Sequence, residues 1–144
     1  MRFFFYGSLL DEDVTALVVG RRLPPTAWIP ATLSGFSRRK AKGVTYPVAI
    51  RDPKGKVEGA VVGGFSQKEV ERLQAYEGVR YHTVPLKVRI HGRITIVSVF
   101  EPKVKAFQPV DGVWSLALWQ RREKRKFVER IRKVFSAHPA YSRQ

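Results

Sequence analysis

The chain opens with an apolar run, Phe3-Phe4-Phe5-Tyr6. Four consecutive aromatic residues favour a β-strand that is buried on both faces. The next pair, Gly7-Ser8, favours a sharp bend, and Val14, Leu17 and Val18 then recur at helical spacing. The pattern predicts a strand, a tight loop and a helix. Such a junction can direct backbone N–H groups toward one point and bind an anion, although the same pattern also fits elements that serve only as core.

Three further strands are predicted between residues 26 and 65. Residues 26–42 form a long strand that bends at Gly35. Residues 46–50 and 57–65 form two shorter strands on either side of Asp52-Pro53-Lys54-Gly55, which has proline and glycine at the positions that a β-turn favours. The two shorter strands are therefore predicted to pair as an antiparallel hairpin.

A helix is predicted over residues 67–77. Ser66 and Glu69 have the spacing of a capping box, in which each side chain accepts a hydrogen bond from the other residue's backbone N–H. Gly78 stands where a C-terminal cap is expected. Glu77 is therefore the last residue of the predicted helix.

A second hairpin is predicted from residues 82–90 and 94–100, joined by the short turn His91-Gly92-Arg93. Pro85 lacks a backbone N–H, so its strand is expected at a sheet edge or at a bulge. Residues 103–112 are expected to form a loop.

A long helix is predicted over residues 114–135, and residues 137–144 are interpreted as a frayed tail. The latter half of this helix carries an apolar stripe of four residues, Phe127, Ile131, Val134 and Phe135. Its opposite face is strongly basic. This pattern is typical of an amphipathic helix that packs on a core and exposes a cationic side.

The order of elements favours one domain, residues 1–144, of the α+β class. Hairpins outnumber parallel crossovers, so we expect a mainly antiparallel sheet that is open or closed. With 144 residues, of which 44% are hydrophobic, the chain is long enough to bury a substantial core.

The composition excludes several kinds of chemistry. There is no cysteine, so disulfide and thiolate chemistry are excluded. His82, His91 and His138 lack metal-ligand spacing, so we expect no zinc site and no other metal. No apolar run is long enough to span a membrane, and the N-terminal run lacks a signal-peptide cleavage site. We therefore expect a cytoplasmic protein that does not bind a membrane.

The formal net charge of +15 favours a polyanionic partner such as nucleic acid. One basic cluster comprises Arg38, Arg39, Lys40 and Lys42, and a larger one extends from Arg121 to Lys133. A run of charges more often forms a solvated face, however. The sequence also lacks a recognisable nucleic-acid motif.

Glu77 is a candidate general acid/base. An acidic residue at a helix C-terminus is disfavoured by the helix dipole by about 0.3–1 kcal/mol, which raises its pKa, and burial among nearby aromatic residues would raise it further. A carboxyl group that titrates near neutrality is suited to proton transfer. An exposed glutamate at a fraying helix end is the alternative.

Two motifs resemble the signatures of the gamma-glutamylcyclotransferase-like (AIG2-like) family. The first, Tyr6-Gly7-Ser8-Leu9 after an aromatic strand, resembles the family's Y-G-S/T-L pattern. The second resembles its L-x-x-F/Y-E-G-x-x-Y pattern, matched here at Leu73, Tyr76, Glu77, Gly78 and Tyr81. The resemblance extends over about residues 1–102.

This resemblance implies a small mixed, mainly antiparallel β-barrel with flanking helices, and a gamma-glutamylcyclotransferase. Such an enzyme, an acyltransferase, releases 5-oxoproline from a gamma-glutamyl amine or amino acid without a metal or cofactor. Glu77 would be the catalytic acid/base, and the Tyr6–Leu9 loop would bind the substrate's α-carboxylate through the N–H groups of Gly7, Ser8 and Leu9. Tyr81 would place its hydroxyl near Glu77 or, as an alternative, only anchor the barrel.

Two features depart from the family pattern. Family members often carry arginine two positions after the second-motif tyrosine, where this chain has Thr83; Arg80 or a basic residue from another strand is a possible replacement. The strongly basic C-terminal helix is not part of the pattern. A non-catalytic module that binds polyanions is therefore the alternative function. The sequence does not assign the leaving amine or the oligomeric state.

Overall fold

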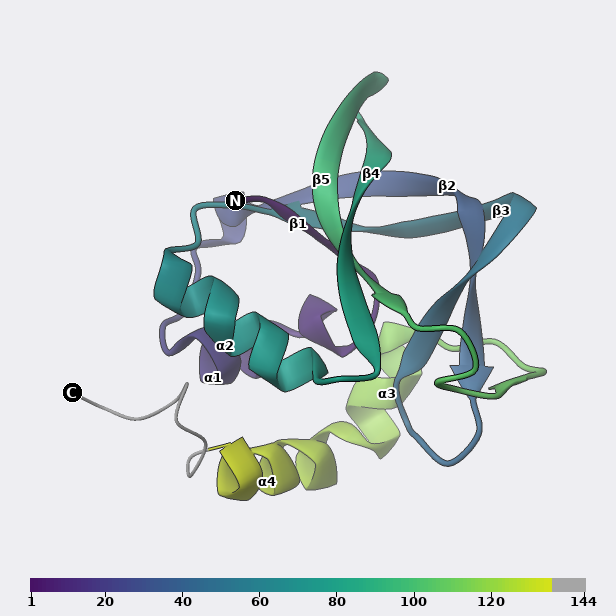
Figure 1. The fold of residues 1–144 in the computed structure, drawn as a ribbon. Helices are drawn as coiled ribbons and strands as arrows, with labels where there is room; N and C mark the ends of the chain where they lie inside the picture. The colour runs from purple at the N-terminus through teal and green to yellow at the C-terminus, as the bar shows by residue number, and fades with distance from the viewer. Residues whose placement is uncertain (136–144) are drawn as a thin grey trace.

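The computed structural model describes residues 1–135. Its strands are β1 (Phe3–Phe5), β2 (Trp28–Ala41), β3 (Pro47–Val62), β4 (Tyr81–Ile90), β5 (Arg93–Pro102) and β6 (Pro109–Val110). Its α-helices are α1 (Glu12–Val19), α2 (Gln67–Glu77), α3 (Leu116–Arg122) and α4 (Lys124–Phe135), and Ser8–Leu10 and Pro25–Ala27 are short 3-10 helices. In Figure 1 the helices gather below the barrel, and the β4–β5 hairpin projects away from them.

Five strands close into a mixed β-barrel. The sheet has the order β3-β1-β5-β4-β2-β6, and an additional β2–β3 pairing closes the ring. β1 pairs in parallel with β5, and the other pairings are antiparallel. The expected α+β class with a mainly antiparallel, closed barrel and flanking helices is confirmed.

The predicted hairpin between residues 46–50 and 57–65 is wrong. Both segments belong to the single long strand β3, and both pair with β2. The four residues 52–55 face only Gly35 on β2, because the register passes from Ser34–Lys56 to Phe36–Arg51. The turn signature therefore forms a bulge within a strand. A Cβ at Gly55 would lie 2.3 Å from the carbonyl oxygen of Phe36, so the close approach of the two strands requires glycine.

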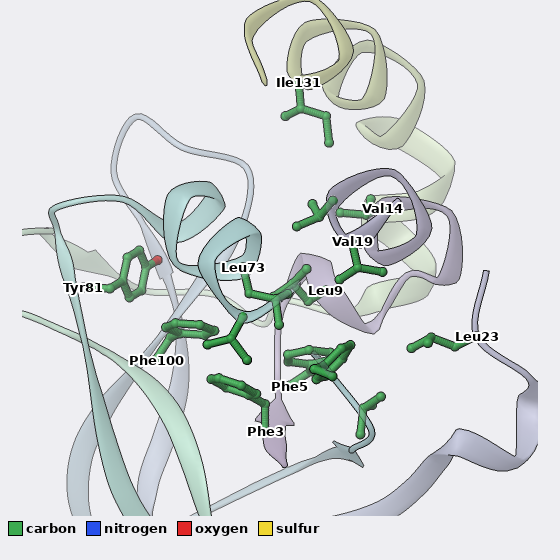
Figure 2. Close-up of a cluster of buried hydrophobic side chains, with 14 of the residues drawn as sticks. Phe3, Phe5, Leu9, Val14, Val19, Leu23, Leu73, Tyr81, Phe100 and Ile131 are labelled. Carbon is green, nitrogen blue, oxygen red and sulfur yellow. The ribbon is translucent and has the colours of Figure 1, made fainter. Parts of the chain in front are cut away.

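β1 separates two cores, which explains its fully buried sequence. Successive side chains of a strand point to opposite faces. Phe3 and Phe5 point toward the helices, and Phe4 and Tyr6 point into the barrel interior. Figure 2 shows the helical side, where Phe3 and Phe5 lie beside Phe100 and beneath helix α2. The prediction of a strand buried on both faces is confirmed.

The capping box of α2 is confirmed. The Ser66 hydroxyl accepts a hydrogen bond from the N–H of Glu69, the Glu69 carboxylate accepts one from the N–H of Ser66, and the helix ends at Glu77 before Gly78. Pro85 lies at an edge as predicted, since β4 pairs with β5 throughout but pairs with β2, among the described residues, only at Arg89.

The predicted continuous helix over residues 114–135 is wrong, because it consists of two helices. The Ser115 hydroxyl accepts a hydrogen bond from the N–H of Leu118 and begins α3, and the chain breaks at Glu123 before α4. The break lets both Trp119 and Phe127 face the core, with ring centroids 5.2 Å apart. Phe127 and Ile131 are buried as predicted. The side chains of Val134 and Phe135 and the tail 137–144 lie outside the described residues.

Candidate active site

The Tyr6–Leu9 loop leads from β1 into a 3-10 helix. The N–H of Leu10 donates to the carbonyl of Gly7 (2.9 Å), and the N–H of Asp11 donates to that of Ser8 (3.0 Å). The N–H groups of Ser8 and Leu9 stand at the beginning of this turn, where no acceptor exists within the helix. A Cβ at Gly7 would lie 3.2 Å from the ring of Pro47, so the loop packs tightly against the start of β3.

Three hydrogen bonds fix the loop from different elements. The Tyr6 hydroxyl donates to the carbonyl of Phe100 (2.6 Å), and the Thr15 hydroxyl donates to that of Leu9 (2.7 Å). Arg38 Nη1 donates to the carbonyl of Tyr6 (3.0 Å), and its guanidinium lies over the ring of Trp114. The interpretation of Arg38 as one of a surface cluster of cations missed this role, because no local pattern marks which cation turns inward.

Ser8 connects the loop to helix α2. Its hydroxyl lies 2.6 Å from the hydroxyl of Tyr76, in a hydrogen bond that spans the two sequence motifs. Tyr76 immediately precedes Glu77 at the end of α2. The bond therefore joins the loop to the helix end that carries the candidate acid/base.

Glu77 lines the same pocket as the loop. A cavity of about 20 Å³ is lined by residues that include Tyr6–Leu9, Glu77 and Tyr81. A wider pocket of about 210 Å³, which Glu77, Ser8 and Tyr81 also line, extends toward α4. The structure thus brings together all of the predicted site residues: Tyr6, Gly7, Ser8, Leu9, Glu77 and Tyr81.

Burial raises the pKa of Glu77 to about 8, from an ordinary value of 4.5. The predicted direction of the shift is confirmed, and its cause is removal of the carboxylate from water. Between pH 7 and 8 the group can therefore both accept and donate a proton, as general acid/base catalysis requires.

Three tyrosine residues line the pocket together with Glu77. Burial raises the pKa of Tyr6, Tyr46 and Tyr81, and the negative charge of Glu77 raises each of them further. The three hydroxyls therefore remain protonated and can donate hydrogen bonds.

Arg80 interacts with the Tyr46 hydroxyl and lies over the ring of Phe107. Thr83 lines a neighbouring hollow of about 180 Å³ together with Glu77.

The raised pKa of Glu77 predicts a pH-dependent stability. Between about pH 4.5 and 8 the folded protein holds a proton that the unfolded chain has released. The free energy of unfolding should therefore fall as the pH rises through this window, by at most about 1.4 kcal/mol per unit. Glu77→Gln removes the titrating group, so its free energy of unfolding should not fall in this way. Urea unfolding should therefore show that the difference in stability between the variant and the wild type shifts in favour of the variant from pH 5 to pH 8. A constant difference between the two proteins would contradict the shift.

A separate pocket of about 240 Å³ is lined by residues such as Trp114, Trp119 and Arg122. It shares Tyr46 with the site, but neither Glu77 nor the Tyr6–Leu9 loop lines it.

Within residues 1–135 no group of three or more histidine, aspartate or glutamate side chains is placed to hold a metal ion. No helix in the same residues is long and apolar enough to cross a membrane.

A sequence model described as "Gamma-glutamyl cyclotransferase, AIG2-like" matches residues 3–116, which is most of the chain. The chain belongs to the gamma-glutamyl cyclotransferase, AIG2-like family. The match includes both motifs and every predicted site residue, whereas helix α4 lies beyond it. The resemblance suggested by the two motifs is confirmed.

Relatives within the AIG2-like family are known from Arabidopsis thaliana. AIG2-like protein A is 33% identical over 133 residues, which cover 91% of this chain and 79% of the relative. A solution structure from the same organism has 31% identity and a TM-score of 0.66, with 96% of this chain and 92% of that chain covered. A structure named gamma-glutamyl cyclotransferase has 20% identity and a TM-score of 0.60, covers 75% of this chain and 68% of that one, and supports the fold alone.

Proposed function

We propose that this protein is a gamma-glutamyl cyclotransferase that releases 5-oxoproline from a gamma-glutamyl compound. The observation that carries the proposal is the shared pocket of Glu77 and the Tyr6–Leu9 loop, in which burial raises the pKa of the carboxyl group to about 8. Membership of the family supports the same reaction class.

In this proposal the loop holds the glutamyl group. The N–H groups of Ser8 and Leu9 at the start of the 3-10 turn, with that of Gly7, bind the substrate's α-carboxylate, since such turns present positive partial charge to an anion. The bond between Ser8 and Tyr76 keeps this cradle at a fixed position relative to Glu77. Binding thereby folds the substrate so that its amine approaches its own γ-carbonyl carbon.

Glu77 transfers the protons of the reaction. Its carboxylate takes a proton from the α-amine, and the amine nitrogen then bonds to the γ-carbon to close a five-membered ring. The bond from the γ-carbon to the leaving nitrogen breaks as Glu77 returns the proton to that nitrogen. A pKa of about 8 makes the carboxylate a stronger base than an ordinary glutamate, so proton exchange with an amine costs less.

Tyrosine hydroxyls stabilise the oxyanion in this scheme. The γ-carbonyl oxygen gains negative charge when the amine attacks, and donors that are already in place lower the barrier. Tyr81 and Tyr46 line the pocket beside Glu77, and their hydroxyls remain protonated. The Tyr6 hydroxyl is engaged by the carbonyl of Phe100, so Tyr6 contributes through its backbone.

The proposal is tested with a panel of gamma-glutamyl dipeptides, gamma-glutamyl amines and gamma-glutamyl-lysine. Purified protein is incubated with each compound, and 5-oxoproline is measured by mass spectrometry. We expect 5-oxoproline and the free amine in equal amounts from at least one compound. If no compound of the panel yields 5-oxoproline, the proposed activity is contradicted and only the assignment of the fold stands.

Polyanion binding is the second hypothesis. It is supported by seven exposed cations on α3 and α4, namely Arg121, Arg122, Arg125, Lys126, Arg130, Arg132 and Lys133. It is weakened by Lys124, which instead pairs with Asp11 (2.9 Å) and Asp13 (2.6 Å). Affinity for a DNA duplex that falls steeply with salt would favour this hypothesis.

A further inference from the structure

Helix α4 forms one wall of the pocket that contains Glu77. Phe127, Arg130 and Ile131 line the 210 Å³ pocket opposite residues of the two motifs. This helix lies outside the region matched by the family model, so the family match assigns it no role. The pocket is thus completed by residues that neither motif contains.

The wall is held firmly in place. Phe127 packs edge-on against Tyr76 and Tyr46, with both ring centroids 6.4 Å away, and Ile131 points from α4 toward the helical core (Figure 2). Lys124 ties the start of α4 to the start of α1 through Asp11 and Asp13. Residues on the pocket side of α4 therefore have a defined position relative to Glu77.

Arg130 is the cation of this wall. In the part of the chain that the structure describes, no carboxylate pairs with Arg130, whereas its neighbours Lys124 and Arg125 do form ion pairs. Glu77 is not its partner, because burial is the cause of the pKa shift of Glu77 and no cation offsets it. Arg130 is exposed and lines the pocket, so the donors of its guanidinium group are accessible to a ligand there.

We propose that Arg130 binds the carboxylate of the leaving amino acid, so that the substrate is a gamma-glutamyl amino acid with an apolar side chain. The inference rests on the proposed cyclotransferase function. With the glutamyl group held between the loop and Glu77, the leaving half extends into the pocket toward α4. Guanidinium recognises carboxylate through paired, charge-assisted hydrogen bonds. Phe127, Ile131 and Tyr76 offer an apolar surface to the side chain.

The placement relates to both departures from the family pattern. Thr83 stands where family members often carry arginine, and the C-terminal helix is unusually basic. In this proposal α4 supplies a cation to the pocket from another part of the chain. A leaving amine without a carboxylate would leave Arg130 without a partner, and a polyamine would bring a second positive charge beside it.

The test compares gamma-glutamyl-phenylalanine with gamma-glutamyl-phenethylamine, which differ only in the carboxylate of the leaving group. Wild type, Arg130→Gln and Arg130→Lys are assayed for 5-oxoproline release with both compounds. We expect Arg130→Gln to lower kcat/KM for the phenylalanine compound about 10- to 100-fold, mainly through KM, with little change for the phenethylamine compound. Arg130→Lys, which keeps the charge but not the paired geometry, should be intermediate.

Arg132→Gln serves as the control, since Arg132 is an exposed cation on the same helix that does not line the pocket. It should leave both rates unchanged. An equal effect of Arg130→Gln on the two compounds, or no effect on either, would overturn the assignment of Arg130 while leaving the cyclotransferase function intact. Absence of product from both compounds with wild-type protein would overturn the proposed function and, with it, this inference.

Discussion

Glu77→Gln should lower kcat/KM for a gamma-glutamyl amino acid by about 10²–10⁴-fold, because the variant keeps the shape of the carboxyl group but cannot accept a proton. KM should change little, since the substrate's carboxylate binds the loop and not Glu77. The measurement is the initial rate of 5-oxoproline release at several substrate concentrations and at pH values from 6 to 9. The rise in wild-type kcat/KM toward pH 8 should disappear in the variant.

Glu71→Gln is the matched control for this experiment. Glu71 lies on the same helix but is exposed, so its replacement tests the loss of one acidic charge without a change in the pocket. We expect wild-type activity from this variant. Wild-type rates from Glu77→Gln would show that another group transfers the proton.

Phe3→Ala should lower the free energy of unfolding by about 3–5 kcal/mol, the usual cost of removing a fully buried aromatic side chain. The Phe3 ring stacks on Phe100 with centroids 5.1 Å apart and meets Phe65 edge-on at 6.1 Å. Urea unfolding followed by tryptophan fluorescence measures the loss. Phe3 does not line the pocket, so the folded variant should retain the wild-type KM.

Val104→Ala provides the comparison for Phe3→Ala. The Val104 side chain is 90% exposed, so its truncation should change the stability by no more than about 0.5 kcal/mol. A loss from Phe3→Ala as small as that from Val104→Ala would contradict the position of β1 between the two cores.

Local signals were sufficient where an element is built from its own residues. The aromatic run of β1 predicts burial on both faces because no polar residue interrupts it, and Ser66 and Glu69 specify the start of α2 through contacts within four residues. The end of α2 at Glu77 follows from Gly78 in the same way. These elements carry the loop and the acid/base, so the two central parts of the site were predictable.

Long-range pairing decided the features that local signals missed. The Asp52–Gly55 segment does form a local hydrogen bond, from the N–H of Lys54 to the Asp52 carboxylate, as in a turn. The partner strand β2 nevertheless continues past it, so the segment becomes a bulge in β3. Likewise the break at Glu123 depends on how Trp119 and Phe127 pack, which helical periodicity does not reveal.

Local sequence patterns also fail to predict which cationic side chains lie at the site. The sequence contains 27 lysine and arginine residues, and no local pattern distinguishes those that turn inward. Arg38 donates a hydrogen bond to the loop at Tyr6, and Arg130, which lines the pocket from α4, lies more than fifty residues after Glu77 in the chain. Only the folded arrangement brings these two residues to the motifs.

In the proposed reaction the substrate's own amine attacks the γ-carbonyl beside Glu77. The most direct test is the reaction of wild-type protein with its preferred gamma-glutamyl compound in water enriched with oxygen-18, followed by mass spectrometry of the products. Cyclisation yields 5-oxoproline without label, because the γ-carbonyl oxygen is retained and no water enters. Glutamate that carries oxygen-18 in its γ-carboxylate would instead show hydrolysis and contradict the proposed reaction.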